Sequence, residues 1–270
     1  MLKITTLVEN TTISSEYGCK HGLCIYIETS KHKILFDLGP NKLFAENAIK
    51  MNIDIADIDI VIISHGHKDH GGALNYFLEQ NKKAKIYIRK EAFEPHYIKV
   101  LNIPFNVGLD KRLINHKQII YTDGKTVIDE ELILFSNVDR MYNISNNVLF
   151  SKSQGKMVLD DFCHEQNLII STGEEKVLIS GCSHAGIVNI QNKAEQIVAD
   201  KIDMVIGGFH LNNPVTKKYD ETIESVAVSL KQKGSIYYTG HCTGPKAYKR
   251  MKAVMGDKMK HLSTGTEIER

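Results

Sequence analysis

The sequence predicts an α/β protein with an αββα architecture, in which two mixed β-sheets are sandwiched between layers of helices. Short runs of β-branched residues alternate with amphipathic segments and glycine-rich turns along the chain. One run, Ile58–Ile63, is apolar at every position except Asp59, as expected for a strand buried on both faces. The second half of the chain resumes the strand–helix rhythm of the first half. Two sheets covered by helices on their outer faces account for this pattern.

The first 90 residues predict a regular succession of strands and helices. Strands are expected at Leu2–Val8, Leu23–Glu28, Lys33–Phe36, Ile58–Ile63 and Lys85–Ile88, and helices at Leu43–Met51 and Gly72–Asn81. The second and third strands are close enough in sequence to form a hairpin through Thr29–His32.

The pattern is less regular between Glu91 and about Asn147, where Pro95, Pro104 and Gly108 interrupt it. We interpret residues 91–147 as a family-specific insert within a single domain of residues 1–270, and as a candidate cover for the active site. The insert contains strand-like runs at Gln118–Thr122, Thr126–Ile128 and Leu132–Phe135. Beyond it we expect strands at Asn167–Ser171, Lys176–Ser180, Asp203–Ile206 and Ser235–Thr239, and helices at Val188–Ala199 and Thr222–Lys231.

The composition favours an ordinary globular protein, with 42% hydrophobic and 24% charged residues. The formal net charge is only +2 and no long run of like charge occurs, which argues against nucleic acid or a membrane surface as a partner. No apolar run reaches the ~18 residues of a membrane span, and residues 1–8 do not resemble a signal peptide. The five scattered cysteines fit a reducing compartment. We therefore expect a cytoplasmic protein without a nucleic-acid or membrane partner, and its oligomeric state stays open.

The strongest chemical signal is the segment HGHKDH (65–70), which directly follows the buried strand. Three imidazoles and one carboxylate within six residues can converge on metal, because imidazole supplies nitrogen donors and Asp69 supplies a hard, negatively charged oxygen. Gly66 and the pair Gly71–Gly72 allow the chain to turn tightly around such a centre. The segment therefore predicts a metal site.

Six segments together resemble the metallo-β-lactamase superfamily: KILFDLG (33–39), HGHKDH (65–70), DFCHEQ (161–166), KVLISGCSH (176–184), VIGGFHL (205–211) and YYTGHCTG (237–244). The combination of GCSHAGI, GGFH and GHCTG is narrower. It resembles the branch named after 7,8-dihydropterin-6-methyl-4-(β-D-ribofuranosyl)aminobenzene-5′-phosphate synthase, which HGLCIYIET (21–29) and ENA (46–48) also fit. The resemblance implies the metallo-β-lactamase fold and its type of active site, but it does not fix the substrate.

The resemblance also implies two divalent metal ions and a set of ligands for them. Nitrogen-rich ligation favours zinc, although iron or manganese would also fit. One metal would be bound by His65, His67 and His164, and the other by Asp69, His70 and His241. Asp37 would accept a hydrogen bond from a ligand histidine and orient it.

One departure concerns the position where most hydrolytic relatives have Gly-Asp, whose carboxylate bridges both metals. Here Gly181 is followed by Cys182, Ser183 and His184. Either the Cys182 thiolate takes the place of that carboxylate, or Cys182 is a packing residue and His184 completes the site or donates a proton. The sequence leaves both alternatives open.

The implied activity is that of a metal-dependent hydrolase, in which a metal-bound hydroxide attacks a phosphoester, thioester or similar ester. Asp69, His184 and His210 are the candidate catalytic residues. A synthase-like condensing enzyme with a phosphorylated or pterin-like substrate is one alternative, and a non-catalytic sensor that binds metal and ligand is another.

The remaining histidines, together with Cys19 and Cys24, are expected to play no part in the site. His32, His96, His116 and His261 lie in polar or irregular stretches and are predicted to face solvent, as is His21. Cys19 and Cys24 lack a second pair of cysteines and are interpreted as free thiols. Glycine-rich loops near Gly207 and Gly240 suggest a close approach of the backbone to a ligand.

Overall fold

The computed structural model describes residues 2–141, 149–153, 155–173, 175–212 and 220–270. By their internal contacts the residues divide into two compact units. Unit 1 comprises Met1–Asp123, Asn147–Gln166 and Ser263–Arg270, and unit 2 comprises Gly124–Asn146 and Asn167–Leu262. The expectation of one domain over residues 1–270 stays a prediction, and each unit is described separately.

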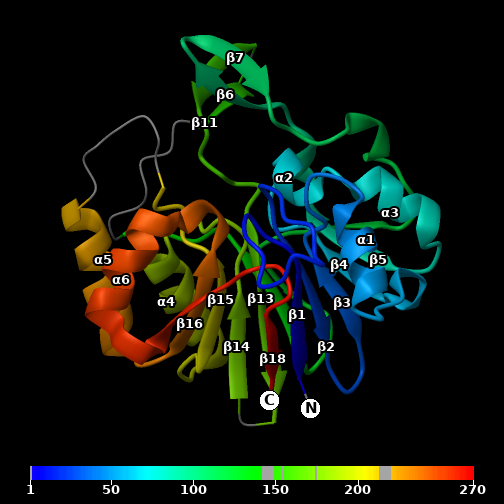
Figure 1. The fold of residues 1–270 in the computed structure, drawn as a ribbon. Helices are drawn as coiled ribbons and strands as arrows, with labels where there is room; N and C mark the ends of the chain where they lie inside the picture. Colours follow the sequence, from blue (N-terminus) through cyan, green and yellow to red (C-terminus); the bar gives the residue numbers. More distant parts are fainter. Residues whose placement is uncertain (1, 142–148, 154, 174, 213–219) are drawn as a thin grey trace. The chain divides into compact units, whose positions relative to one another are not determined.

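Unit 1 is built on a seven-stranded mixed sheet with the order β18-β1-β2-β3-β4-β5-β8 (Figure 1). The neighbours from β18 to β3 are antiparallel, and those from β3 to β8 are parallel. The expected hairpin joins β2 and β3, where the Thr29 amide donates to the His32 carbonyl. The strands are β1 (Lys3–Val8), β2 (Cys24–Glu28), β3 (Lys33–Phe36), β4 (Ile60–Ile62), β5 (Lys85–Arg89), β8 (Ile119–Thr122) and β18 (Glu267–Glu269).

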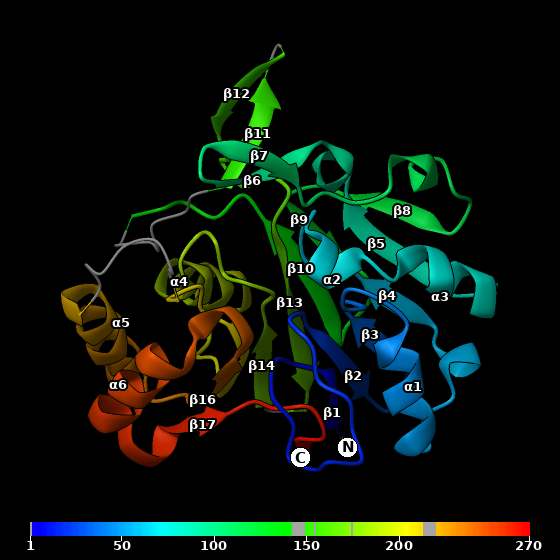
Figure 2. The ribbon, with the colours of Figure 1, turned by 45° about the horizontal axis from the view of Figure 1, so that its top comes forward.

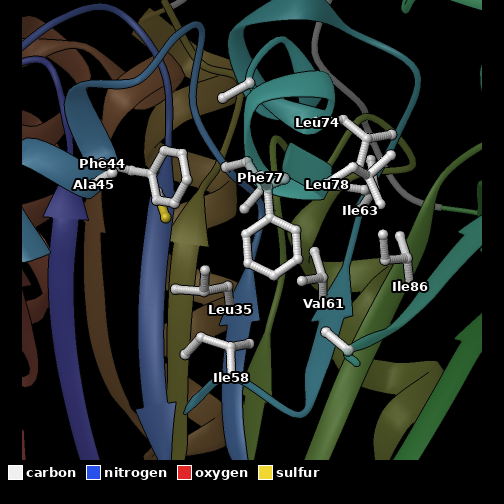
Figure 3. Packing of buried hydrophobic residues seen from close by; sticks show 14 of the residues in the cluster. Leu35, Phe44, Ala45, Ile58, Val61, Ile63, Leu74, Phe77, Leu78 and Ile86 are labelled. Carbon is white, nitrogen blue, oxygen red and sulfur yellow. The ribbon is translucent and has the colours of Figure 1, made fainter. Parts of the chain in front are cut away.

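Helices α1 (Leu43–Lys50) and α3 (Leu74–Gln80) bury their apolar residues against this sheet, and the short α2 (Lys68–Gly71) precedes α3. Phe44 of α1 and Phe77 of α3 are fully buried in one cluster with strand residues such as Leu35 and Val61 (Figure 3). Burying a side chain of this size stabilises the fold by roughly 1.5–3 kcal/mol. The core therefore holds the carboxyl ends of β3 and β4 in place, and the HGHKDH segment follows β4.

Residues 91–147, expected to form one insert, contribute to three different sheets. β6 (His96–Val100) and β7 (Ile103–Asn106) form a four-stranded antiparallel sheet with β11 (Leu149–Ser153) and β12 (Lys156–Leu159), in the order β12-β11-β6-β7 (Figure 2). β8 belongs to the large sheet of unit 1, whereas β9 (Lys125–Val127) and β10 (Leu132–Ser136) belong to the sheet of unit 2.

Unit 2 contains the second seven-stranded mixed sheet, with the order β17-β16-β15-β14-β13-β10-β9. Neighbouring strands are parallel from β14 to β17, whereas the β13–β14 and β9–β10 pairs are antiparallel. The strands are β9 (Lys125–Val127), β10 (Leu132–Ser136), β13 (Gln166–Thr172), β14 (Glu175–Ile179), β15 (Met204–Gly208), β16 (Ile236–Gly240) and β17 (Met259–His261).

The helices of unit 2 are α4 (Ile187–Val198), α5 (Asp220–Lys233) and α6 (Pro245–Met255), and α5 packs beside α6 (Figure 2). Their buried side chains form a second core with the strands around Tyr237, Ile169 and Leu178. Two mixed sheets flanked by helices agree with the fold class that the sequence predicts.

Candidate metal centre

In unit 1 the HGHKDH segment runs from the end of β4 into the first turn of α2. His67 is the residue that precedes α2, so Asp69 and His70 lie in its first turn. His65 and His70 are fully buried and His67 is 5% exposed. The ring centroids of His65 lie 4.5 Å from His67 and 4.1 Å from His70. The segment thus gathers its three imidazoles into one buried cluster, as the sequence predicts.

The Asp37 carboxylate organises two of these rings. Its Oδ2 atom lies 2.6 Å from His70 Nδ1 and accepts a hydrogen bond of 2.7 Å from Ser64 Oγ, while Oδ1 accepts one of 2.7 Å from Ser64 N. Ser64 Oγ also lies 2.8 Å from His65 Nδ1. A carboxylate that receives the Nδ1 proton fixes the tautomer of a histidine and leaves Nε2 as the metal-binding atom. The expected contact between Asp37 and a histidine of the motif is therefore present.

Asp69 differs from these buried rings because its side chain is 25% exposed. Its Oδ2 atom lies 3.7 Å from His70 Nε2 and 3.2 Å from Nε2 of His21, whose side chain is 67% exposed. This carboxylate is therefore reachable from solvent beside a buried imidazole, which suits a group that binds metal or carries a proton.

A second cluster in unit 1 brings together His67, His96, Asp160 and His164, whose potential ligand atoms all lie within 4.8 Å of one another. His96 Nδ1 lies 2.8 Å from Asp160 Oδ2, and the rings of His96 and His164 are 4.0 Å apart. His96 is only 2% exposed, so the prediction that it faces solvent is wrong. It is the first residue of β6 and turns inward, because pairing with β11 places it beside residues that lie 55 or more positions away.

Gly66 explains how His96 can approach the motif. A Cβ atom at Gly66 would lie 2.6 Å from His96 Nε2 and 2.5 Å from the Ala92 carbonyl oxygen. Such distances are far below van der Waals contact, so the position requires glycine. The sequence suggests Gly66 as a turn residue, but it does not indicate which side chain fills the space that the glycine leaves.

His164 is held by the motif itself, because the Gly66 amide donates a hydrogen bond of 2.9 Å to His164 Nδ1. In a neutral ring that bond assigns the proton to Nε2, which lies 3.4 Å from Asp160 Oδ1. Ligation of a metal through Nε2 would require this proton to leave. The role of His164 as a ligand stays a prediction.

Burial and neighbouring charges set the protonation of this second cluster. Burial lowers the pKa of His67 well below its usual value, and the neighbouring His164 lowers it further. Burial likewise lowers the pKa of His164, against the opposite effect of Asp160. Burial alone would raise the pKa of Asp160, but its contacts with His164 and His96 outweigh burial and hold that pKa well below its usual range. The Asp160 carboxylate is therefore ionised beside the neutral rings of His67 and His164, and carboxylate and imidazole are donor types that fit a divalent cation.

In unit 2 the candidate residues follow the carboxyl ends of neighbouring parallel strands. Cys182 and His184 follow β14, His210 follows β15, and His241 follows β16. Loops at this edge of a parallel sheet come together, which is why ligands bind there in α/β proteins. Cys182, His184 and His241 are at most 3% exposed, and the rings of His184 and His210 lie 4.4 Å apart.

These loops have an unusual backbone. Ser183, His210 and His241 adopt φ values of 57°, 44° and 47°, in the left-handed region that is uncommon for residues other than glycine. Such conformations persist where surrounding packing imposes them, and they are frequent at functional sites.

Cys242, which the sequence analysis does not single out, lies in the same group of side chains. Its sulfur, that of Cys182 and a ring nitrogen of His210 lie within 4.8 Å of one another. Burial alone would raise the pKa of the Cys242 thiol, but its contacts with Cys182 and His210 and the nearby His241 hold that pKa well below its usual value. The sequence shows Cys242 only as the cysteine of GHCTG. A single cysteine in that motif does not indicate which side chains lie beside it in the fold.

Comparison with known proteins agrees with this fold and these motifs. The model of the metallo-beta-lactamase superfamily matches residues 17–241. The 7,8-dihydropterin-6-methyl-4-(beta-D-ribofuranosyl)-aminobenzene-5′-phosphate synthase of Methanocaldococcus jannaschii is 32% identical over 99% of this chain and 96% of its own length. An uncharacterized protein of the same organism is 28% identical over 93% of each chain.

Among solved structures, Tm1679, described as a metal-dependent hydrolase of the beta-lactamase superfamily, has a TM-score of 0.87 and 28% identity. The match covers 100% of this chain and 99% of that one. Among the residues described for this chain, no helix has the length and apolar character needed to cross a membrane. The fold, the HGHKDH segment and the extent of these matches together establish that the chain belongs to the metallo-beta-lactamase superfamily.

Proposed function

We propose that the protein is a metal-dependent hydrolase of small-molecule esters, with a phosphoester or thioester as the substrate class. The observation that carries the proposal is the arrangement around Asp37, which fixes His70 through Nδ1 and reaches His65 through Ser64. Buried, neutral and oriented imidazoles are the form in which histidine binds metal. No comparable arrangement is needed for histidines that only pack in a core.

The ligand scheme expected from the sequence is retained as part of this proposal. His65, His67 and His164 would hold one divalent ion, and Asp69, His70 and His241 the other, with Cys182 or His184 in the position of the usual bridging carboxylate. Zinc is favoured by the nitrogen-rich donor set, and iron or manganese remain compatible with it. When bound, the metals would activate water and stabilise the charge that develops on the substrate oxygen.

The chain's own residues would orient the reactants and move protons. Asp69 is partly exposed and its Oδ2 lies 3.2 Å from His21 Nε2, so its carboxylate is restrained on the solvent side of the motif. From there it could accept a proton from the attacking water and return it to the leaving group. His184 and His210, whose rings lie 4.4 Å apart in unit 2, remain the candidates for a further proton donor.

Turnover of a panel of phosphodiesters, thioesters and lactones tests this proposal. His67→Ala and Asp69→Ala should reduce hydrolysis to background and lower the bound metal per chain, while the circular dichroism spectrum and the melting temperature stay close to wild type. His261→Ala, a change at an exposed histidine, is the matched control and should retain full activity. Wild-type activity in both site variants would contradict the proposed mechanism.

A condensing enzyme is the second candidate, and the 32% identity to the M. jannaschii synthase favours it. Both reactions need groups that bind anionic oxygen, so the same residues serve either. A dihydropterin diphosphate and a ribofuranosylaminobenzene phosphate, supplied together, would be joined into one product with release of diphosphate if this candidate is correct. A chain that binds metal and these ligands, but converts neither substrate class, would be a sensor.

A further inference from the structure

Three adjacent parallel strands of unit 2 place two thiols and an imidazole side by side. Cys182 follows β14, His210 follows β15 and Cys242 follows β16. The register of β14, β15 and β16 places the starts of these loops at the same edge of the sheet, because Ile179 pairs with Ile206 and Gly208 pairs with Gly240. Residues 60 positions apart therefore meet at one edge of the sheet.

The packing around Cys242 fixes the position of its sulfur. The His210 amide donates to Cys242 Sγ at 3.2 Å, and the sulfur lies 3.6 Å from the Cys182 carbonyl oxygen. A Cβ atom at Gly208 would lie 2.5 Å from this sulfur, so the glycine leaves the space that the thiol occupies. In addition, Thr243 Oγ1 accepts a hydrogen bond of 2.9 Å from the Phe209 amide, which ties the loops after β15 and β16 together.

A second observation points to a ligand at this place. Nδ1 of His210 is buried and has no hydrogen-bond partner within the described part of the chain. The potential ligand atoms of the three residues lie within 4.8 Å of one another. In a tetrahedral zinc site, bonds of ~2.3 Å to sulfur and ~2.0 Å to nitrogen separate the ligands by about 3.5–3.8 Å. Small side-chain adjustments would therefore complete the geometry.

We propose that Cys182, His210 and Cys242 form a binding site for a soft divalent metal of the zinc class. Two thiolates and one imidazole leave a fourth position open for water or substrate, a ligand set that zinc accepts in catalytic sites. Thiolate sulfur selects zinc over the hard cations magnesium and calcium.

The site goes beyond the proposed function, with which it shares only Cys182 and His210. It assigns Cys182 to a ligand group made entirely by unit 2, which leaves His184 for the position of the usual bridging carboxylate. It also makes His210 a metal ligand instead of a proton donor. The alternative left open by the sequence, a single Cys182 thiolate in the hydrolytic centre, gives Cys242 no role.

Cobalt(II) substitution of the full chain tests the proposal, because sulfur bound to cobalt gives a charge-transfer band in the near ultraviolet. The wild type should show this band, Cys182→Ser and Cys242→Ser should each lower it by about half, and the double variant should remove it, as expected for one band contribution per thiolate. Cys163→Ser, a change at an exposed thiol, is the matched control and should leave the band unchanged.

His67→Ala separates this proposal from the proposed function, since it should abolish hydrolysis and preserve the band. A wild type without the band, or a band that Cys182→Ser removes and Cys242→Ser leaves intact, would overturn the site.

Alkylation of the wild type provides a measurement that does not depend on any variant folding. Bound zinc should protect both Cys182 and Cys242 from iodoacetamide, as judged by mass spectrometry of their peptides. Equal labelling of Cys242 with and without zinc would refute its role.

Discussion

The contacts of Asp37 make Asp37→Asn the most informative single substitution in unit 1. The side chain is fully buried, and its φ of 59° lies in the left-handed region. Asparagine tolerates that region about as well as aspartate, so the backbone should be unaffected. The substitution therefore changes only the hydrogen bonds and the charge.

The expected loss of metal affinity follows from which oxygen of Asp37 each hydrogen-bond partner uses. Oδ1 accepts the Ser64 amide, so the asparagine oxygen must stay there, and its NH2 group must replace Oδ2. The NH2 group then faces His70 Nδ1 at the position where Oδ2 lies 2.6 Å away. His70 must accept at Nδ1 and carry its proton on Nε2, the atom that would bind metal. Loss of such an orienting carboxylate typically weakens metal binding about 10–100-fold, which corresponds to roughly 1.4–2.8 kcal/mol.

Competitive titration against a chromophoric chelator measures the effect directly. Asp257→Asn is the matched control, because the Asp257 side chain is fully exposed to solvent. Metal affinity should fall in Asp37→Asn and stay at the wild-type value in Asp257→Asn. A dissociation constant for Asp37→Asn within about twofold of wild type would refute the reasoning that Asp37 sets the tautomer of His70.

Three further predictions concern stability. Phe77→Ala removes a fully buried ring from the core shown in Figure 3 and should lower the free energy of unfolding in urea by about 3–5 kcal/mol. Val228→Ala, at a half-exposed site, should lower it far less. Equal losses in the two variants would contradict the packing of Phe77. Gly66→Ala places a Cβ atom 2.5 Å from the Ala92 carbonyl oxygen and should lower the free energy of unfolding by about 1–3 kcal/mol in the same assay. Unchanged stability would contradict this close approach. Burial raises the pKa of Tyr237 to about 12. The unfolded value is ~10, so the folded state holds this proton more tightly, and up to about 2–3 kcal/mol of stability is lost as the pH rises through that interval. Tyr237→Phe should flatten this alkaline decline, and an equally steep decline in the variant would assign it to other groups.

Elements with a strong local signal were predictable from the sequence. Ile58–Ile63 is apolar except at Asp59 and includes the interior strand β4, and the hairpin of β2 and β3 lies where alternation and turn residues place it. Helix α6 escaped prediction because it is rich in lysine and its buried Ala247, Met251 and Met255 are only a sparse stripe. The small sheet escaped prediction because β7 exposes Ile103 and Phe105, and because the residues of β6 pair with residues of β11 that lie 51–55 positions away.

The site shows the same division between local and distant information. The HGHKDH segment carries its ligands within six residues, so its clustering follows from the sequence alone. His96 contacts Asp160, which lies 64 positions away in the sequence, and no sequence pattern around either residue predicts that contact. A polar stretch next to a proline predicts a solvent-facing histidine, and only the pairing of β6 turns this one inward.

The glycines of the second half show how a correct signal can have a different physical cause. The pair Gly207–Gly208 suggests a close approach of the backbone to a ligand, yet a Cβ atom at Gly207 would lie 2.1 Å from the Ser180 carbonyl oxygen of the neighbouring loop. Gly207 has a φ of 149°, which most side chains avoid. The glycines thus let the loops after β14 and β15 touch, which places Cys182 beside His210, and Gly208 leaves the space that the Cys242 sulfur occupies. A substitution at Gly207 would therefore disturb the thiol pair without contacting it.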